Sequence, residues 1–170
     1  MVTIRCTRKL YRFLGITPIE DPEPATGALG DWYANLVPTY AGDLIMFVNE
    51  RSLVTVAVPV REVENLLPLF RLRVENLLLM LDVEQEVIDR EVSHLEPVQF
   101  AKTASRSILG SMNDIAWNYQ YISEEAEYVS RLSLSDAELK LSMMPSGVLE
   151  YQLPAEVAID LLEGSSSRAS

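Results

Sequence analysis

Residues 102–121, KTASRSILGSMNDIAWNYQY, constrain the fold more than any other segment, because they combine a helical period with many small and polar side chains. An α-helix turns by about 100° per residue. At that angle the apolar side chains fall on one arc, which contains Ile108, Met112, Ile115, Ala116 and Tyr119. This spacing predicts a helix that packs one face in the core. Thr103 or Ser105 can cap its first turn, since a hydroxyl there accepts a bond from a free backbone N–H.

The opposite face of this helix carries Arg106, Gly110, Asn113 and Trp117, and Asp114 lies between the two faces. A glycine inside a helix costs about 1 kcal/mol relative to alanine. Its usual reason is close approach of another backbone or a ligand, and here we expect a neighbouring strand. The tryptophan predicts that this second face is covered too. Arg106, Asn113 and Asp114 are expected to form a satisfied structural network against nearby loops, with a binding surface as the alternative.

Three apolar segments, at residues 31–37, 44–49 and 53–60, predict consecutive strands. The link at 49–52 is short and polar, as an antiparallel hairpin requires. Segment 44–49 is apolar on both faces, which places it inside the sheet under some cover. Residues 61–82 are helical by pattern, with Pro68 at the first turn of a new helix. We therefore expect one α+β domain, in which a mixed or antiparallel sheet, with the 31–60 meander at its centre, packs against helices 61–82 and 104–121.

The remaining segments complete this domain. Residues 2–5 predict a strand and 84–95 a helix, and 98–102 predict a strand that leads into the helix of 104–121. Residues 16–30 hold three prolines and two glycines, which favour a surface loop long enough for a lid or a partner-facing segment. Towards the C-terminus we expect a helix at 134–143, a last strand at 148–153 and a short helix at 155–162. The domain is expected to span 1–156, with a short helix or disordered tail at 157–170, and Arg131 is expected on a solvated segment.

Charge limits the classes of partner. The 170 residues include 14 Lys and Arg against 25 Asp and Glu, a formal net charge of −11. Phosphate backbones and anionic lipids repel such a chain, so we expect no direct nucleic-acid partner and no membrane. The single cysteine, Cys6, is incompatible with an internal disulfide framework and fits a reducing cytoplasm. Arg5, Arg8, Lys9 and Arg12 form a local basic cluster, expected to be a solvated helix face, with a patch for a small anion or an acidic partner as the alternative.

Four motifs carry a resemblance to a known family. They are IRCTRKL near the start, GDWYANL at 30–36, FVNERSL at 47–53 and KTASRSILGSMND at 102–114. In order and spacing they resemble the bacterial family named domain of unknown function 6933, from about residue 3 to residue 151. The resemblance implies a bacterial protein of a kind often encoded near mobile or plasmid genes. It carries over no catalytic residue, cofactor or ligand, and it does not extend beyond about Glu156.

The motifs and the helical pattern select the same candidate binding residues. They are Asp31, Trp32, Asn35, Asn49, Glu50, Lys102, Arg106, Gly110, Ser111, Asn113 and Asp114. Asp31, Glu50 and Asp114 could also bind Mg²⁺ through carboxylate oxygens if they converged. Carboxylates in an acidic chain more often solvate the surface, so we expect no metal, no cofactor and no catalytic residue. His94, the only histidine, is interpreted as a partly buried structural side chain.

Two functions remain open from the sequence. The first is a non-enzymatic binding or regulatory protein of the bacterial cytoplasm that acts on a protein partner and is linked to mobile elements or defence. Small acidic proteins can occupy a basic surface of a partner, an argument by analogy only. The alternative is a small hydrolase or transferase. Its cluster would consist of Asp31, Glu50, Arg106, Asn113 and Asp114, and whether these side chains share a solvent-accessible cavity distinguishes the two functions.

Overall fold

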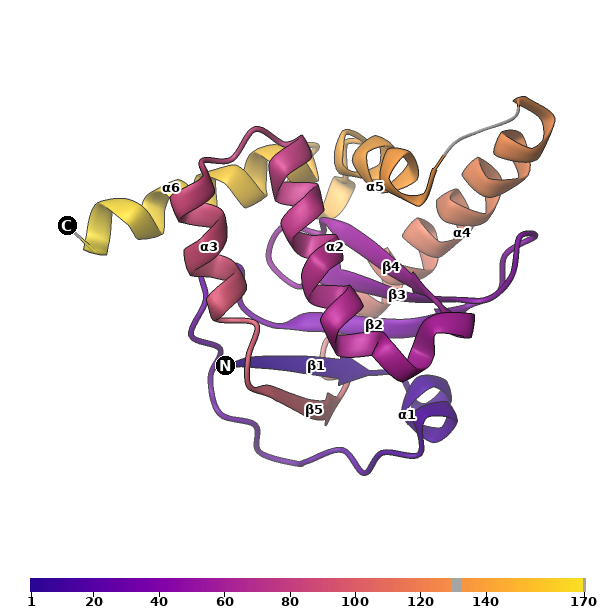
Figure 1. The fold of residues 1–170 in the computed structure, drawn as a ribbon, viewed down its shortest axis with the longest axis horizontal. Coiled ribbons are helices and arrows are strands. Elements are labelled where there is room, and N and C mark those ends of the chain that lie inside the picture. Colours follow the sequence, from indigo (N-terminus) through magenta and orange to yellow (C-terminus); the bar gives the residue numbers. More distant parts are fainter. Residues whose placement is uncertain (130–132, 170) are drawn as a thin grey trace.

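Five strands form one mixed sheet in a computed structural model that describes residues 1–129 and 133–169 (Figure 1). The strands are β1 (Val2–Cys6), β2 (Trp32–Val37), β3 (Leu44–Asn49), β4 (Thr55–Pro59) and β5 (Val98–Lys102), in the order β4-β3-β2-β1-β5. β1 runs parallel to both β2 and β5, whereas β2, β3 and β4 form an antiparallel meander. The predicted α+β class and the meander are confirmed. Arg131 lies outside the described residues.

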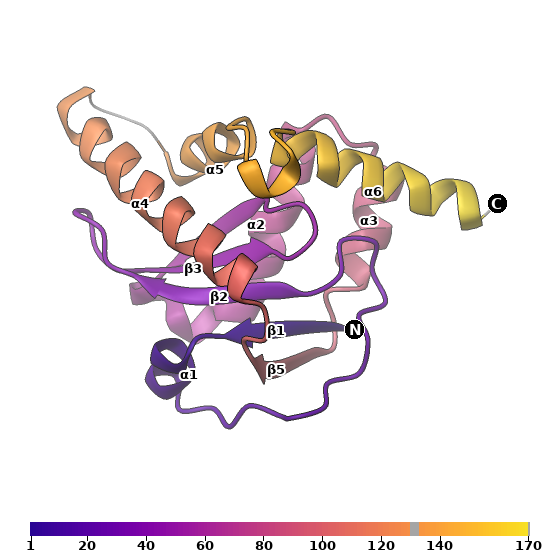
Figure 2. The ribbon, with the colours of Figure 1, turned by 180° about the vertical axis from the view of Figure 1, so that it is seen from behind.

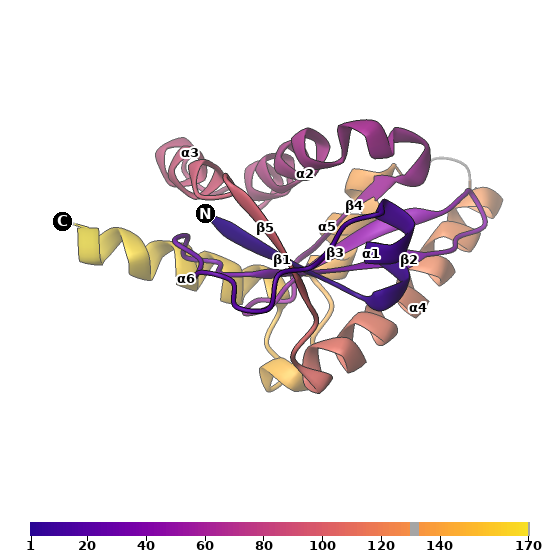
Figure 3. The same cartoon turned by 90° about the horizontal axis from the view of Figure 1, so that it is seen from below.

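Helices cover both faces of the sheet. They are α1 (Arg8–Leu14), α2 (Leu66–Met80), α3 (Gln85–Ser93), α4 (Arg106–Val129), α5 (Leu134–Ser142) and α6 (Pro154–Ala169), with 3₁₀ turns at Val60–Asn65 and Gly147–Leu149. Seen from below, α2 and α3 lie on one side of the sheet and α4 on the other (Figure 3). The two helices expected to pack on the sheet therefore do so on opposite faces.

The two faces of the sheet bury separate hydrophobic cores, because successive side chains of a strand point to opposite faces. On the α2 side, the ring of Phe70 lies 5.3 Å from that of Trp32 and 4.4 Å from that of Phe47, between ring centres. On the α4 side, Met46 and Val48 of the same strand β3 pack with residues of α4 and α5. This double cover explains why segment 44–49 is apolar throughout.

One prediction for the C-terminal region is wrong. Residues 148–153 form no strand: Gly147–Leu149 is a 3₁₀ turn, and Glu150 and Tyr151 have φ angles of 53° and 68°. Both edges of the sheet are already occupied, since the Glu138 carboxylate accepts the Ala57 N–H of β4 and the Ile19 N–H donates to β5. For residues 157–170 the sequence left open a short helix or a disordered tail, and in the structure α6 continues to Ala169.

Residues 16–30 follow the outer edge of β5 as an extended surface loop (Figure 1). Ile19 N donates to Phe100 O at 2.8 Å, and Glu23 N donates to the side-chain oxygen of Gln99 at 3.1 Å. Near its end, the buried Glu91 carboxylate of α3 accepts the N–H groups of Ala28 and Leu29. The predicted surface loop is confirmed, and these bonds fasten it to the sheet and to α3.

Candidate functional site

Helix α4 crosses the sheet face opposite α2 (Figure 2). Its inward side chains Met112, Tyr119 and Ile122 are buried, and Ile108 and Ile115 pack half-buried against the same core. Ser105 caps its first turn, because the Ser105 hydroxyl oxygen accepts the Ile108 N–H at 3.3 Å. The apolar stripe read from the sequence is therefore confirmed.

The outward face of α4 is open to solvent. It consists of residues spaced at helical intervals, namely Arg106, Gly110, Asn113, Trp117 and Tyr121, which we call the outer face of α4. Trp117 is 66 % exposed and Tyr121 52 %, and their rings stack with centres 6.1 Å apart and planes inclined by 11°. No described part of the chain shields this aromatic pair, so the expectation that the second face is covered is wrong.

The expectations for Gly110 and for the polar side chains of α4 are also wrong. A Cβ atom added to Gly110 would meet nothing within 4 Å, so no neighbouring strand comes close to this glycine. Arg106, Asn113 and Asp114 are exposed. Within residues 1–129 and 133–169, no bond joins their side chains to one another. The expected structural network is therefore not formed.

The carboxylates near the strands hold backbone in place instead. Asp31 Oδ1 accepts the Thr3 N–H at 3.2 Å, and Asp31 Oδ2 accepts Arg5 Nε at 3.2 Å and pairs with Arg5 Nη2 at 3.2 Å. Glu50 Oε1 accepts the backbone N–H of Asp31 at 3.0 Å. These two side chains thereby tie β1, the start of β2 and the hairpin after β3 together.

Asn49 is the centre of a buried hydrogen-bond network. Its Nδ2 donates to Leu29 O at 2.8 Å and to Asp31 O at 3.2 Å. Its Oδ1 accepts from the Ser52 N–H at 2.9 Å and the Ser52 hydroxyl at 2.8 Å, and from Arg51 N at 3.2 Å. Because its amide group is fully engaged and fully buried, the structure gives Asn49 a role in closing the hairpin.

The other strand residues divide between core and surface. Trp32 is completely buried against Phe70. Asn35 Oδ1 accepts the Thr7 hydroxyl at 2.8 Å and the Leu36 N–H at 2.9 Å, which ties β2 to the start of α1. Lys102 is exposed at the end of β5. None of these positions lies on the outer face of α4.

Ser111 and Asp114 line a cavity of about 340 Å³ between α4, the start of β4 and the turn after α5. The Ser111 hydroxyl is buried there and has no hydrogen-bond partner among the described residues. Of the five side chains proposed as a catalytic cluster, Asp114 lines this cavity, whereas Asp31 and Glu50 are bonded to backbone elsewhere. The structure therefore does not assemble that cluster around this cavity.

The described residues show no group of three or more His, Cys, Asp or Glu side chains placed to hold a metal ion. His94 Nδ1 lies 2.8 Å from the Thr26 hydroxyl, and the ring is half-buried beside the 16–30 loop, which confirms the structural interpretation. Cys6 is buried in β1, and burial raises the pKa of its thiol to about 12, so this cysteine is a small core residue. None of the helices in the described part of the chain has the length and hydropathy of a membrane span.

Comparison with known families identifies the chain. The family model described as Domain of unknown function (DUF6933) matches residues 3–157. The chain belongs to this family. The match runs from β1 to the first turn of α6 and contains all four motifs that suggested the resemblance. Searches of curated proteins and of solved structures found no match.

The DUF6933 chain also contains a buried ion pair that the sequence analysis missed. Glu138 of α5 is fully buried, and its Oε1 accepts from Ala57 N at 2.9 Å and Arg73 Nε at 3.1 Å. Burial raises the pKa of Glu138 to about 7, although Arg73 acts in the opposite direction. The helical pattern held a signal for this position, because Glu138 falls between Ala137 and Leu141 on the buried arc of α5.

Proposed function

We propose that this DUF6933 chain is a non-enzymatic binding protein whose outer face of α4 docks onto a basic surface of a protein partner. The observation that carries the proposal is the stacked, exposed pair of Trp117 and Tyr121. Large aromatic side chains supply much of the energy of protein interfaces, since they bury a wide area with few rotatable bonds. A stacked pair is also ordered before binding, which lowers the entropy lost on association.

Gly110 supports the same surface. It lies about two turns before Trp117 and about three before Tyr121, and no described residue makes a close contact that would account for a glycine. The missing side chain leaves a shallow gap in which a partner's backbone can approach the helix. Arg106 and Asn113 are exposed on the same face and offer polar groups for the rim of an interface.

Charge favours a basic partner. The net charge of −11 attracts positively charged surfaces over a distance set by the ionic strength, and it increases the rate of encounter with them. The proposal places this encounter in the cytoplasm, in agreement with a single buried cysteine. The enzymatic alternative has no comparable support, because its five residues are divided between backbone bonds and open surface.

Capture from a bacterial lysate, followed by titration of the purified captured protein, tests the proposal. Three immobilised forms are compared: the wild type, the double variant Trp117→Ala/Tyr121→Ala, and the control Tyr40→Ala, which removes a 71 % exposed aromatic side chain that is not part of the outer face of α4. We expect the wild type and the control to bind a basic protein that salt releases. The double variant should bind it at least about tenfold more weakly, which corresponds to about 1.4 kcal/mol. Equal affinity of all three forms would rule out this surface.

A further inference from the structure

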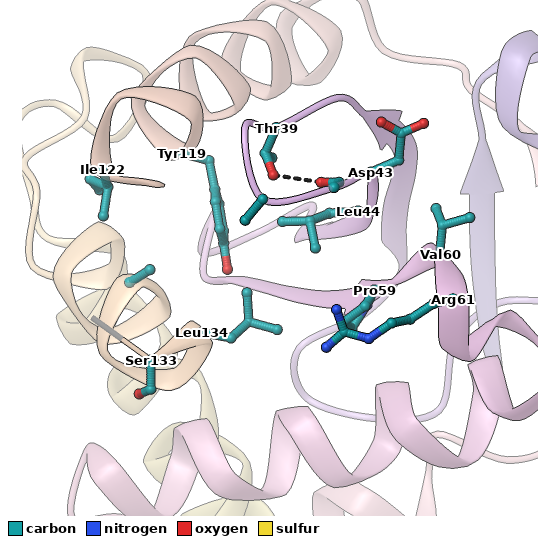
Figure 4. A pocket seen from close by; sticks show the side chains of 13 residues that line it. Thr39, Asp43, Leu44, Pro59, Val60, Arg61, Tyr119, Ile122, Ser133 and Leu134 are labelled. Atoms are coloured by element: carbon teal, nitrogen blue, oxygen red, sulfur yellow. Dashed lines mark hydrogen bonds between the residues drawn. The ribbon is translucent and has the colours of Figure 1, made fainter. Parts of the chain in front are cut away.

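Two cavities border α4, and they differ in the charges that line them. The larger one, of about 640 Å³, lies beneath the inward face of the helix, where the ends of β3 and β4 meet the start of α5 (Figure 4). Its lining contains charges of both signs, Asp43 and Arg61. The smaller one, of about 340 Å³, lies between α4 and the turn after α5, and among the described residues Asp114 is the one charged group in its lining. The smaller cavity therefore favours a positive charge.

This smaller cavity, which we call the α4 groove, has a polar wall and an apolar wall. Asp114 and Asn118 of α4 form the polar wall, and within the described residues neither side chain makes a hydrogen bond or an ion pair. The apolar wall includes Leu53, Met144 and Val148. Met144 is 37 % exposed and Val148 53 %, so these side chains retain apolar surface that another molecule can cover. The two walls together match a cation carried on an aliphatic stem.

The described cations of the flanking helices do not neutralise Asp114. Arg106 of α4 and Lys140 of α5 are outside the lining of the groove. Arg106 lies eight residues before Asp114, which is about 12 Å along the helix axis. The Ser111 hydroxyl is buried below the wall, so recognition rests on the side chains of Asp114 and Asn118. The net charge of −11 adds a field that concentrates cations at the surface.

The α4 groove adjoins the outer face of α4. Asp114 precedes Trp117 by three residues and Asn118 precedes Tyr121 by three, so the members of each pair are neighbours on the helix surface. A partner seated on the aromatic pair therefore has the groove within reach of one of its side chains. Arginine suits the groove, because its guanidinium presents several donors to carboxylate and amide oxygens and is less strongly hydrated than an ammonium group. Arginine is also enriched, with tryptophan and tyrosine, at the energetic centres of interfaces.

We propose that the α4 groove receives an arginine side chain of the basic protein partner, with the aliphatic stem on Met144 and Val148 and the guanidinium on Asp114 and Asn118. This inference rests on the proposed docking at the outer face of α4, and it adds the chemical group that the partner presents there. A stem without a charge, or a charge without a stem, would use one wall of the groove alone.

Two matched probes test the groove without the partner: n-butylguanidinium, and n-butylurea, in which a neutral urea replaces the guanidinium. Binding to the full chain is followed through the methionine methyl signals by ¹H–¹³C NMR, and Met144→Leu assigns the signal of Met144. In the wild type we expect n-butylguanidinium to shift this signal and to bind about fivefold more tightly than n-butylurea, the effect of one accessible charge pair. The signal of Met80, on α2 and outside the groove lining, should keep its position.

Asp114→Asn removes the charge of the groove with little change in shape. It should weaken n-butylguanidinium about fivefold, to the affinity of the urea. Asp21→Asn is the matched control, because it removes one negative charge from an exposed position in the 16–30 loop, and it should change neither affinity. Equal affinities of the two probes in the wild type, an equal loss in both variants, or no shift of the Met144 signal would overturn the proposal.

A titration with the captured basic protein distinguishes this inference from the proposed function. Asp114→Asn should bind the partner about fivefold more weakly, and Asp21→Asn should bind it as tightly as the wild type. If Trp117→Ala/Tyr121→Ala weakens the partner and Asp114→Asn does not, docking at the outer face of α4 stands and the arginine site is wrong. If the double variant binds the partner like the wild type, the proposed function itself fails, whatever the probes show.

Discussion

The Nη2 atom of Arg73 lies 2.7 Å from Oε1 of Glu138, which links α2 to α5 across the outer edge of β4. The same carboxylate accepts the Ala57 N–H, a donor that an edge strand would otherwise leave without a partner. The other oxygen, Oε2, is buried and has no partner in the described residues. One oxygen of the buried Glu138 carboxylate is therefore bonded and the other is not, and burial raises the pKa of this residue to about 7.

Stability should fall as pH rises through neutrality because of Glu138. Its pKa is about 7 in the folded protein against an ordinary value of 4.5, so between these values the folded state holds more protons than the unfolded state. The resulting stabilisation is complete below the unfolded pKa and disappears as pH rises through the folded pKa. Between about pH 5 and about pH 8 we expect a loss of about 2–3 kcal/mol from this residue.

Denaturant titrations across this pH range, on the wild type and on Glu138→Gln, measure the loss. The glutamine side chain cannot titrate. Over this pH range the free energy of unfolding of Glu138→Gln should therefore fall by about 2–3 kcal/mol less than that of the wild type. Glu20→Gln, at an exposed position, serves as the control and should follow the wild type. Parallel curves for the wild type and Glu138→Gln would contradict the assignment.

Asn49→Ala should destabilise the protein by about 3 kcal/mol or more, because it leaves the buried Leu29 carbonyl and the buried Ser52 N–H without their partner. Asn113→Ala is the matched comparison, since this asparagine lies exposed on α4, and it should change the free energy of unfolding by less than about 0.5 kcal/mol. Urea denaturation of both variants measures the contrast. Similar losses at the two sites would mean that Asn113 is structural after all.

Met112→Ala should cost about 2–5 kcal/mol, since the side chain is 1 % exposed in the α4 core. Trp117→Ala, five residues further along the helix, removes a larger side chain from the surface and should cost less than about 1 kcal/mol. Thermal melting distinguishes the two. If the tryptophan variant were the less stable one, α4 would be oriented differently on the sheet.

The sequence predicted the parts of the fold that depend on local periodicity. The strands at β2 and β3 and the inward stripe of α4 follow from spacing alone. The false strand at 148–153 failed for a non-local reason. Strand formation needs a free sheet edge, and Glu138 and Ile19 occupy both edges from distant parts of the chain.

The candidate site was predicted less well. A helical pattern shows which side chains share a face, but it does not reveal whether another element covers that face. The presence of Trp117 suggested cover, and the structure leaves it exposed. In the same way, the pattern could not separate Asn49, whose polar groups are all engaged in the core, from Asn113, which is open to solvent. Both are asparagines within family motifs.

The central claim, that the outer face of α4 is the docking surface, is tested most directly by ¹⁹F NMR of the protein labelled with 5-fluorotryptophan. The chain has two tryptophans, the exposed Trp117 and the fully buried Trp32, and Trp117→Phe assigns their resonances. When the captured basic partner is added, we predict that the Trp117 resonance shifts and broadens while the Trp32 resonance keeps its position. A bound complex in which the Trp117 resonance stays unchanged would contradict the claim.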